Sequence, residues 1–141
     1  TLDFLDEIKC VQKEATRLKD EYNVDIIIAL GHSGYELDMK LAKEIPEIDI
    51  VVGGHSHTFL WPSNDSFPSI ETPRGPYPTY VEQDSGKIVP VVQAYCFSKY
   101  VGYFVAHFNA SGGLLSPVDG KGITDARPIL LDNSTSEDEG F

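Results

Sequence analysis

Apolar and polar positions alternate with two different periods along the first third of the chain. In residues 3–21 the apolar positions recur every three or four residues and charged residues fill the opposite face, which predicts an amphipathic helix ended by Asn23. Residues 24–30 and 48–52 are short, nearly unbroken β-branched runs, typical of strands buried on both faces. Residues 36–44 return to helical spacing and stop before Pro46, which predicts a second helix.

The order helix, strand, helix, strand predicts a right-handed parallel β-α-β unit. In such sheets the loops at the carboxyl ends of the strands form the ligand crevice. His32 and His55 each lie one to three residues beyond the end of a predicted strand. We therefore expect both histidines at the same edge of the sheet.

The rest of the chain has a different pattern of apolar, polar and proline residues. Residues 60–78 contain five prolines and predict a long surface loop. Residues 79–82, 87–94 and 100–108 predict strands, with Pro90 favouring an edge or bulge position. The sequence after Asp119 is interpreted as irregular apart from residues 128–131, and residues 132–141 as an acidic linker. The predicted class is therefore α/β, a β-α-β unit followed by a mostly antiparallel β region.

Charge narrows the range of partners. The chain has 141 residues, one domain at most or part of one, and its net charge is -11. A chain this acidic is repelled by nucleic acids and by anionic membranes, although bound divalent cations would reverse the charge locally. Neither a membrane-spanning run nor a signal peptide is recognisable, so we expect no direct membrane insertion in this segment.

Three sequons for N-glycosylation, at Asn64, Asn109 and Asn133, favour a secreted glycoprotein. The two cysteines, Cys10 and Cys96, are interpreted as buried free thiols, with a disulfide between them as the alternative.

Three of the four histidines lie in two glycine-bracketed loops, Gly31-His32-Ser33-Gly34 and Gly53-Gly54-His55-Ser56-His57. Imidazole binds zinc and similar ions, and flanking glycines allow a tight turn and close approach of a ligand. A lone histidine at a strand end is more often a turn or capping residue. Three in two loops predicted to share one sheet edge favour metal binding by His32 and His55. His57 is either a further ligand or a neighbour on the phosphate side.

Other interpretations have less support. The nucleophile-elbow pattern of serine hydrolases fails at both G-H-S loops, and no phosphate-binding glycine fingerprint occurs. His107 is interpreted as a half-buried strand residue. The aromatic residues after His57 could stack on a base, but covering a core is their commoner role; they are Phe59, Trp61, Tyr77 and Tyr80.

The runs IIIALGHSGYELD and IDIVVGGHSHTFL closely resemble the 5'-nucleotidase family, as do the later runs KIVPVVQAYCFSKYVGYFVAHF and PILLDNS. The resemblance implies part of a four-layer α/β/β/α metallophosphoesterase sandwich with two divalent metal ions, zinc being the expected metal. By motif, His32 and His55 correspond to ligands of one metal, and His57 to a position near the other metal or the substrate phosphate.

The same resemblance implies that residues 1–131 are the C-terminal portion of the catalytic domain. Residues 132–141 would lead to a nucleotide-specificity domain absent here. The family's Asp-x-His, Gly-Asp and Asn-His motifs are not in this sequence, so the catalytic residues are expected upstream. The implied protein is secreted or attached to the outer cell surface, dimerises through the C-terminal domain and hydrolyses nucleoside 5'-monophosphates such as AMP. The alternatives are an apyrase acting on ATP and ADP, and a non-catalytic nucleotide-binding relative. We expect the 141 residues alone to be inactive.

Overall fold

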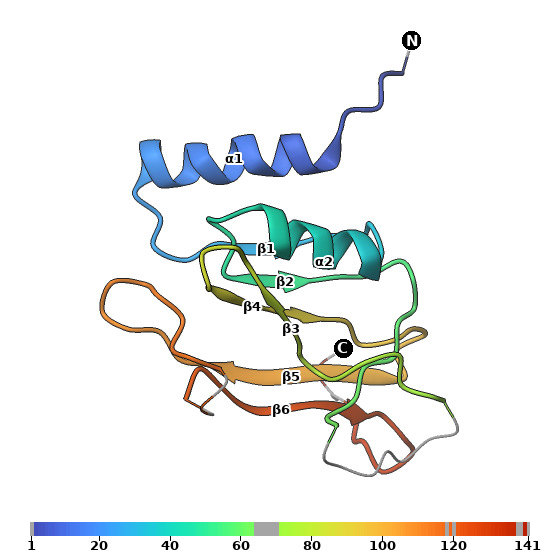
Figure 1. Cartoon of the computed structure of the whole chain (residues 1–141). Helices are drawn as coiled ribbons and strands as arrows, with labels where there is room; N and C mark the ends of the chain where they lie inside the picture. Colours follow the sequence, from blue (N-terminus) through green and yellow to red (C-terminus); the bar gives the residue numbers. More distant parts are fainter. Residues whose placement is uncertain (1, 64–70, 118, 120, 138–139, 141) are drawn as a thin grey trace.

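A computed structural model describes residues 2–63, 71–117, 119, 121–137 and 140, and has two helices and two β-sheets within this range (Figure 1). Its elements are α1 (Glu7–Tyr22), β1 (Ile28–Leu30), α2 (Tyr35–Glu44), β2 (Ile50–Val52), β3 (Thr79–Glu82), β4 (Ile88–Val92), β5 (Tyr100–Ala106) and β6 (Ile123–Leu130).

The four-stranded sheet has the order β1-β2-β4-β3. β1 pairs with β2 and β2 with β4 in parallel, whereas β3 runs antiparallel to β4. The β-α-β unit predicted from the hydrophobic pattern is confirmed. Because three strands are parallel, three carboxyl ends, and not only the two expected, meet at the same edge of this sheet.

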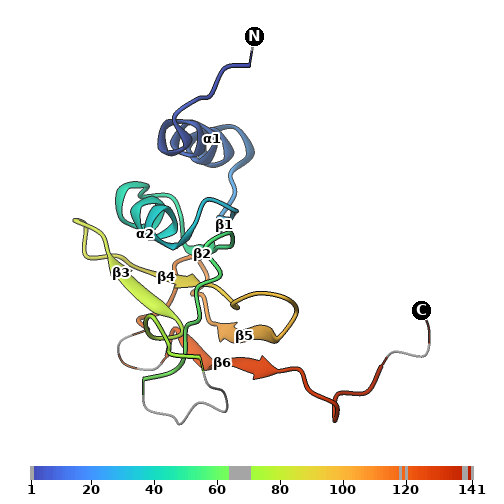
Figure 2. The same cartoon turned by 90° about the vertical axis from the view of Figure 1, so that its right-hand side faces the viewer.

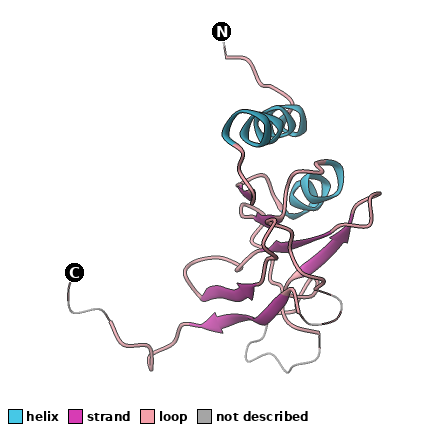
Figure 3. Ribbon diagram, turned by 90° about the vertical axis from the view of Figure 1, so that its left-hand side faces the viewer, coloured by secondary structure: helices cyan, strands magenta, loops and turns pink. Residues whose placement is uncertain are grey.

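The helices lie on one side of the four-stranded sheet and the β5–β6 hairpin lies on the other (Figures 1 and 3). The described residues thus form three layers, α/β/β, and contain no second helical layer. Apolar side chains of α2 and of the sheet's central strands make the main core, including Leu41, Ile45, Val51, Val89 and Val91. The mixed α/β class with a parallel and an antiparallel sheet agrees with the prediction.

Local capping explains where the first helix begins. The predicted helix starts at residue 3, but α1 starts at Glu7 because the Asp6 side chain accepts a hydrogen bond from the Lys9 backbone N–H at 3.1 Å. Asn23 ends α1 in the left-handed conformation, as its position after the apolar stripe predicted.

The prediction that residues 24–30 form a strand buried on both faces was wrong. β1 spans only three residues, and Ile28 and Leu30 are 56% and 82% exposed. Among the described strands β1 pairs with β2 alone, so it lies at the edge of the sheet. In the described residues only the face of β1 that carries Ala29 is partly covered, and the face that carries Ile28 and Leu30 is exposed.

Two predictions about the later strands also need correction. Pro90 lies in β4, between β2 and β3, and not in an edge strand. The ladder with β2 starts at Val91, so the missing N–H of Pro90 falls just before that ladder. The region interpreted as irregular contains β6, which pairs antiparallel with β5 from Tyr100–Leu130 to Ala106–Ile123. The β6 pattern was obscured because its outward positions carry Asp125 and Arg127.

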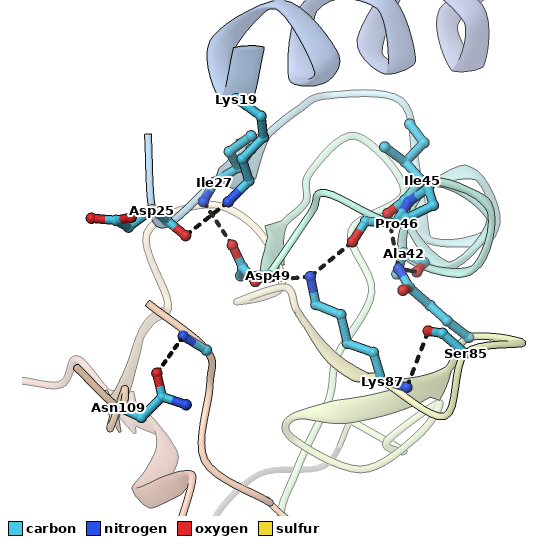
Figure 4. A network of polar contacts seen from close by, with 12 residues as sticks. Lys19, Asp25, Ile27, Ala42, Ile45, Pro46, Asp49, Ser85, Lys87 and Asn109 are labelled. Atoms are coloured by element: carbon cyan, nitrogen blue, oxygen red, sulfur yellow. Dashed lines mark hydrogen bonds and ion pairs between the residues drawn. The ribbon is translucent and has the colours of Figure 1, made fainter. Parts of the chain in front are cut away.

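The amino ends of the parallel strands are held by a polar network at the edge opposite the histidine loops (Figure 4). Asp49 is 4% exposed; its carboxylate accepts from the Ile27 backbone N–H at 2.8 Å and pairs with Lys87 at 2.8 Å. Lys87 also donates to the Pro46 carbonyl at 2.9 Å. This network ties together the segments that enter β1, β2 and β4.

The described residues after β6 lead away from the layers (Figure 2). The first residues of the predicted acidic linker form an exposed turn in which Asp132 accepts from the Ser134 N–H at 2.8 Å. Within the described residues no helix is long and apolar enough to cross a membrane.

Candidate metal-binding loops

The two histidine loops continue directly from β1 and β2. The Gly31 N–H donates to the Val52 carbonyl at 3.0 Å, and the Gly53 N–H donates to the Val92 carbonyl at 2.9 Å. These bonds extend the strand ladders by one residue and so fix the start of each loop. The loops lie side by side, as the β-α-β topology predicted.

The rings of His32 and His55 come together in an edge-to-face arrangement with 5.3 Å between their centroids. Both side chains are exposed at the sheet edge. Two neighbouring imidazoles that face solvent can provide two nitrogen ligands for a single first-row metal ion.

The glycines of these loops are required by close contacts. A Cβ on Gly54 would lie 2.8 Å from the His32 Nδ1 atom, and a Cβ on Gly53 would lie 1.9 Å from the Asp38 Oδ2 atom. Any side chain at either position would displace the histidine or the buried carboxylate. The sequence pattern of paired glycines therefore reflects packing beneath and between the loops.

His57 is separated from the other two histidines. His55 and His57 both have left-handed backbones, with φ of 71° and 50°, so the loop is not extended and the two side chains need not share a direction. The His57 ring packs edge-to-face against Phe97 at 5.3 Å between centroids. His57 also borders a cavity of about 350 Å³ lined by Phe59, Arg74 and Tyr95 among others.

Gln93 is the residue that sequence reasoning missed. It follows β4, the third parallel strand, and is 2% exposed. Its Nε2 group donates to the Gly54 carbonyl at 3.0 Å, and its Oε1 atom accepts from the Thr58 N–H at 2.5 Å and from the Ser56 hydroxyl at 3.2 Å. The sequence carried only part of the signal, a glutamine beside a buried β-branched run, because the parallel pairing of β4 with β2 is needed to place it at the edge of the histidine loops.

Asp38 lies behind Gln93 on α2 and is fully buried. Its Oδ2 atom accepts from the Gln93 Nε2 group at 3.3 Å, while its Oδ1 atom has no hydrogen-bond partner among the residues that the structure describes. Burial raises the pKa of Asp38 to about 6, and the hydrogen bond from Gln93 opposes that rise. A buried carboxylate thus sits beneath the histidine loops, separated from them by Gly53 and Gln93.

The donor set fits part of a metal site. Within the described residues, no group of three or more histidine, cysteine, aspartate or glutamate side chains is placed to hold a metal ion. His32 and His55 supply two adjacent nitrogen donors, and zinc needs three or four ligands. A zinc site at these loops would therefore need further ligands besides His32 and His55.

The other residues singled out from the sequence lie elsewhere. His107 follows the end of β5; it is exposed and not half-buried, and its Nε2 atom bonds the Thr124 hydroxyl at 3.1 Å. Asn109 and Asn133 are exposed in turns, whereas Asn64 lies outside the described residues. Both cysteines are free, and neither is buried as expected: Cys10 is exposed and Cys96 is partly exposed.

Comparison with known proteins gives a consistent result. No protein-family model matches the chain. The chain is 47% identical over 135 residues to a 5'-nucleotidase of Homo sapiens, covering 96% of this chain and 22% of that protein. It is 46% identical over 138 residues to Protein 5NUC of Lutzomyia longipalpis, covering 98% of this chain and 23% of that protein. The crystal structure of a 5'-nucleotidase precursor from Thermus thermophilus matches with a TM-score of 0.77 and 39% identity, over 91% of this chain and 23% of that one.

The fold and the loops define an α/β segment whose histidines meet at the carboxyl edge of a parallel sheet. The sequence matches, which extend over nearly the whole chain, show that it is similar to a segment of 5'-nucleotidases, the family that its motifs resemble. The chain spans less than a quarter of the length of these relatives.

Proposed function

We propose that this chain is the part of a 5'-nucleotidase-type phosphoric monoester hydrolase that supplies His32 and His55 to a divalent metal site. The whole enzyme would convert a nucleoside 5'-monophosphate to nucleoside and phosphate. The observation that carries the proposal is the adjacent, exposed pair of imidazoles at the edge where three parallel strands end.

A bound divalent ion, with zinc as the expected metal, would activate water and stabilise phosphoryl oxygens in such a reaction. His32 and His55 would hold one ion of a two-metal centre. His57 lies beside the cavity lined by Arg74 and Tyr95, where it would contact a substrate phosphate or the second ion. The role of the described residues is to hold and orient ligands, and the groups that transfer protons are expected upstream.

The proposal also covers the location, glycosylation and domain organisation of the protein. We place it outside the cell, secreted or attached to the surface, and expect glycosylation at Asn109 and Asn133, which are exposed. The sequon at Asn64 is expected to be used in the same way. Residues 1–131 would belong to the catalytic domain and residues 132–141 to a linker, with a homodimer formed through a further C-terminal domain.

The test uses the longer polypeptide that carries this segment, and measures phosphate release from AMP, ADP and ATP in the presence of zinc. Preferred release from AMP is expected, and preferred release from ADP and ATP would support the apyrase alternative. Replacing His32 or His55 by alanine should abolish most activity together with bound metal. If the parent protein releases no phosphate from any of these nucleotides but its alanine variants still lose bound metal, the result would support the non-catalytic alternative.

A further inference from the structure

We propose that Gln93 is a positioning residue that holds the His55–His57 loop in its metal-binding conformation, with Asp38 as its support. This inference rests on the proposed metal role of His55. It assigns a function to a buried residue that lies behind the histidine loops.

The first observation is the alternation of contacts along the loop. Gly54, Ser56 and Thr58 each hydrogen-bond to Gln93. His55 and His57, which lie between them, are exposed. One glutamine side chain therefore anchors every second residue of the loop, and the two histidines are left facing outward.

The second observation is the backbone conformation that these anchors maintain. His55 and His57 both have positive φ values, which residues other than glycine rarely adopt. Such conformations persist only where surrounding contacts determine them. Gln93 supplies contacts on both sides of each histidine, which is the arrangement needed to hold two such residues in sequence.

The third observation is how Gln93 itself is fixed. Its Nε2 group donates to Asp38 on α2, and the carboxylate of Asp38 leaves no room for a side chain at Gly53. The Ser56 hydroxyl accepts from the Tyr35 N–H at 3.0 Å, in the first turn of α2. The loop after β2 is thus connected through Gln93 and Ser56 to the helix that follows the His32 loop. These contacts set the distance between the two histidine loops.

A second buried glutamine provides a matched control. Gln83 is 5% exposed and its Nε2 group donates to the Ala42 and Ile45 carbonyls at 2.9 and 2.8 Å. It follows β3, which is antiparallel, so it lies at the sheet edge opposite the histidine loops. Gln93→Met and Gln83→Met each remove a buried amide of the same size, but only Gln93→Met releases the loop.

The experiment measures two properties of the longer polypeptide that carries this segment and of both variants of it: zinc affinity, by competition with a chromophoric chelator, and hydrogen exchange of the Thr58 amide. We expect Gln93→Met to weaken zinc binding by about 10- to 100-fold, the usual range for residues that orient metal ligands. Thr58 exchange should become at least about tenfold faster, since its acceptor is lost. Gln83→Met should change neither.

Equal zinc affinity and equal Thr58 exchange in the two variants would overturn the inference. If Gln93→Met does not fold, Ser56→Ala replaces it, because it removes an exposed link to Gln93; several-fold weaker zinc binding then supports the inference and unchanged binding overturns it. Failure of the proposed function looks different: zinc binding by the wild-type chain would not depend on His32 and His55. The exchange of Thr58 would then decide alone whether Gln93 holds the loop.

Discussion

The buried carboxylate of Asp49 should stabilise the fold far more than an exposed carboxylate with an equally close lysine partner. Asp49→Ala removes the acceptor of the Ile27 backbone N–H and one of the two partners of Lys87. A buried N–H left without an acceptor costs about 1–3 kcal/mol. The lost charge-assisted bond adds about 1 kcal/mol, because Lys87 is partly exposed and keeps the Pro46 carbonyl. We expect the free energy of unfolding to fall by about 3 kcal/mol.

Urea unfolding measures this change, with fluorescence of Trp61, the single tryptophan, which is 8% exposed, as the signal. For a slope of about 2 kcal/mol per molar urea, the midpoint should fall by about 1.5 M. Asp84 is the control, since it pairs with Lys43 at 2.6 Å but is 96% exposed, so Asp84→Ala should barely move the midpoint. Asp49→Asn, which keeps an acceptor for Ile27, should lie between the two. Superimposable curves for Asp49→Ala and Asp84→Ala would refute this reasoning.

Three further predictions concern packing and pH. Because burial raises the folded-state pKa of Asp38 from 3.8 to about 6, its contribution to stability is full below pH 3.8 and is lost as the pH rises through 6. Relative to the wild type, the free energy of unfolding of Asp38→Asn should therefore increase by about 2 kcal/mol as the pH rises from 4 to 7, which is less than the roughly 3 kcal/mol of the full pKa shift. A difference between the two proteins that does not change with pH in urea titrations would contradict this. Gly53→Ala should destabilise by about 1–3 kcal/mol in thermal unfolding, since its Cβ would lie 1.9 Å from the Asp38 carboxylate, whereas Gly31→Ala, with open space around its Cβ, should not. Gly102→Ala should cost a similar amount, because its Cβ would lie 2.6 Å from the buried Tyr77 hydroxyl, and Tyr77→Phe should relieve part of that cost.

The first half of the fold followed from the sequence because its signals are local. The stripe on α1, the β-branched runs and the stop at Pro46 each specify one element, and the short connections leave the parallel β-α-β unit as the arrangement. The edge position of β1 could not be predicted in this way. A run of apolar residues indicates that its side chains are buried in the folded protein, but it does not indicate which strands pair with it.

The candidate site was predicted in part for the same reason. Placing His32 and His55 together needed only the topology rule for strand ends. Finding Gln93 needed the additional fact that β4 lies parallel to β2, which depends on a pairing across the long proline-rich loop. The separation of His57 from the other histidines depends on two left-handed residues in close succession, and such conformations are set by tertiary contacts and not by the residues' own preferences.

Zinc binding to the histidine loops tests the proposed function most directly. The longer polypeptide that carries this segment is titrated with zinc, and so are its variants His32→Ala, His55→Ala and the control His107→Ala, whose ring bonds Thr124 away from these loops. We predict that the first two substitutions each weaken binding by at least about tenfold, or 1.4 kcal/mol, and that His107→Ala leaves it unchanged. Equal zinc affinity in all four proteins would contradict the assignment of His32 and His55 as a metal-binding pair.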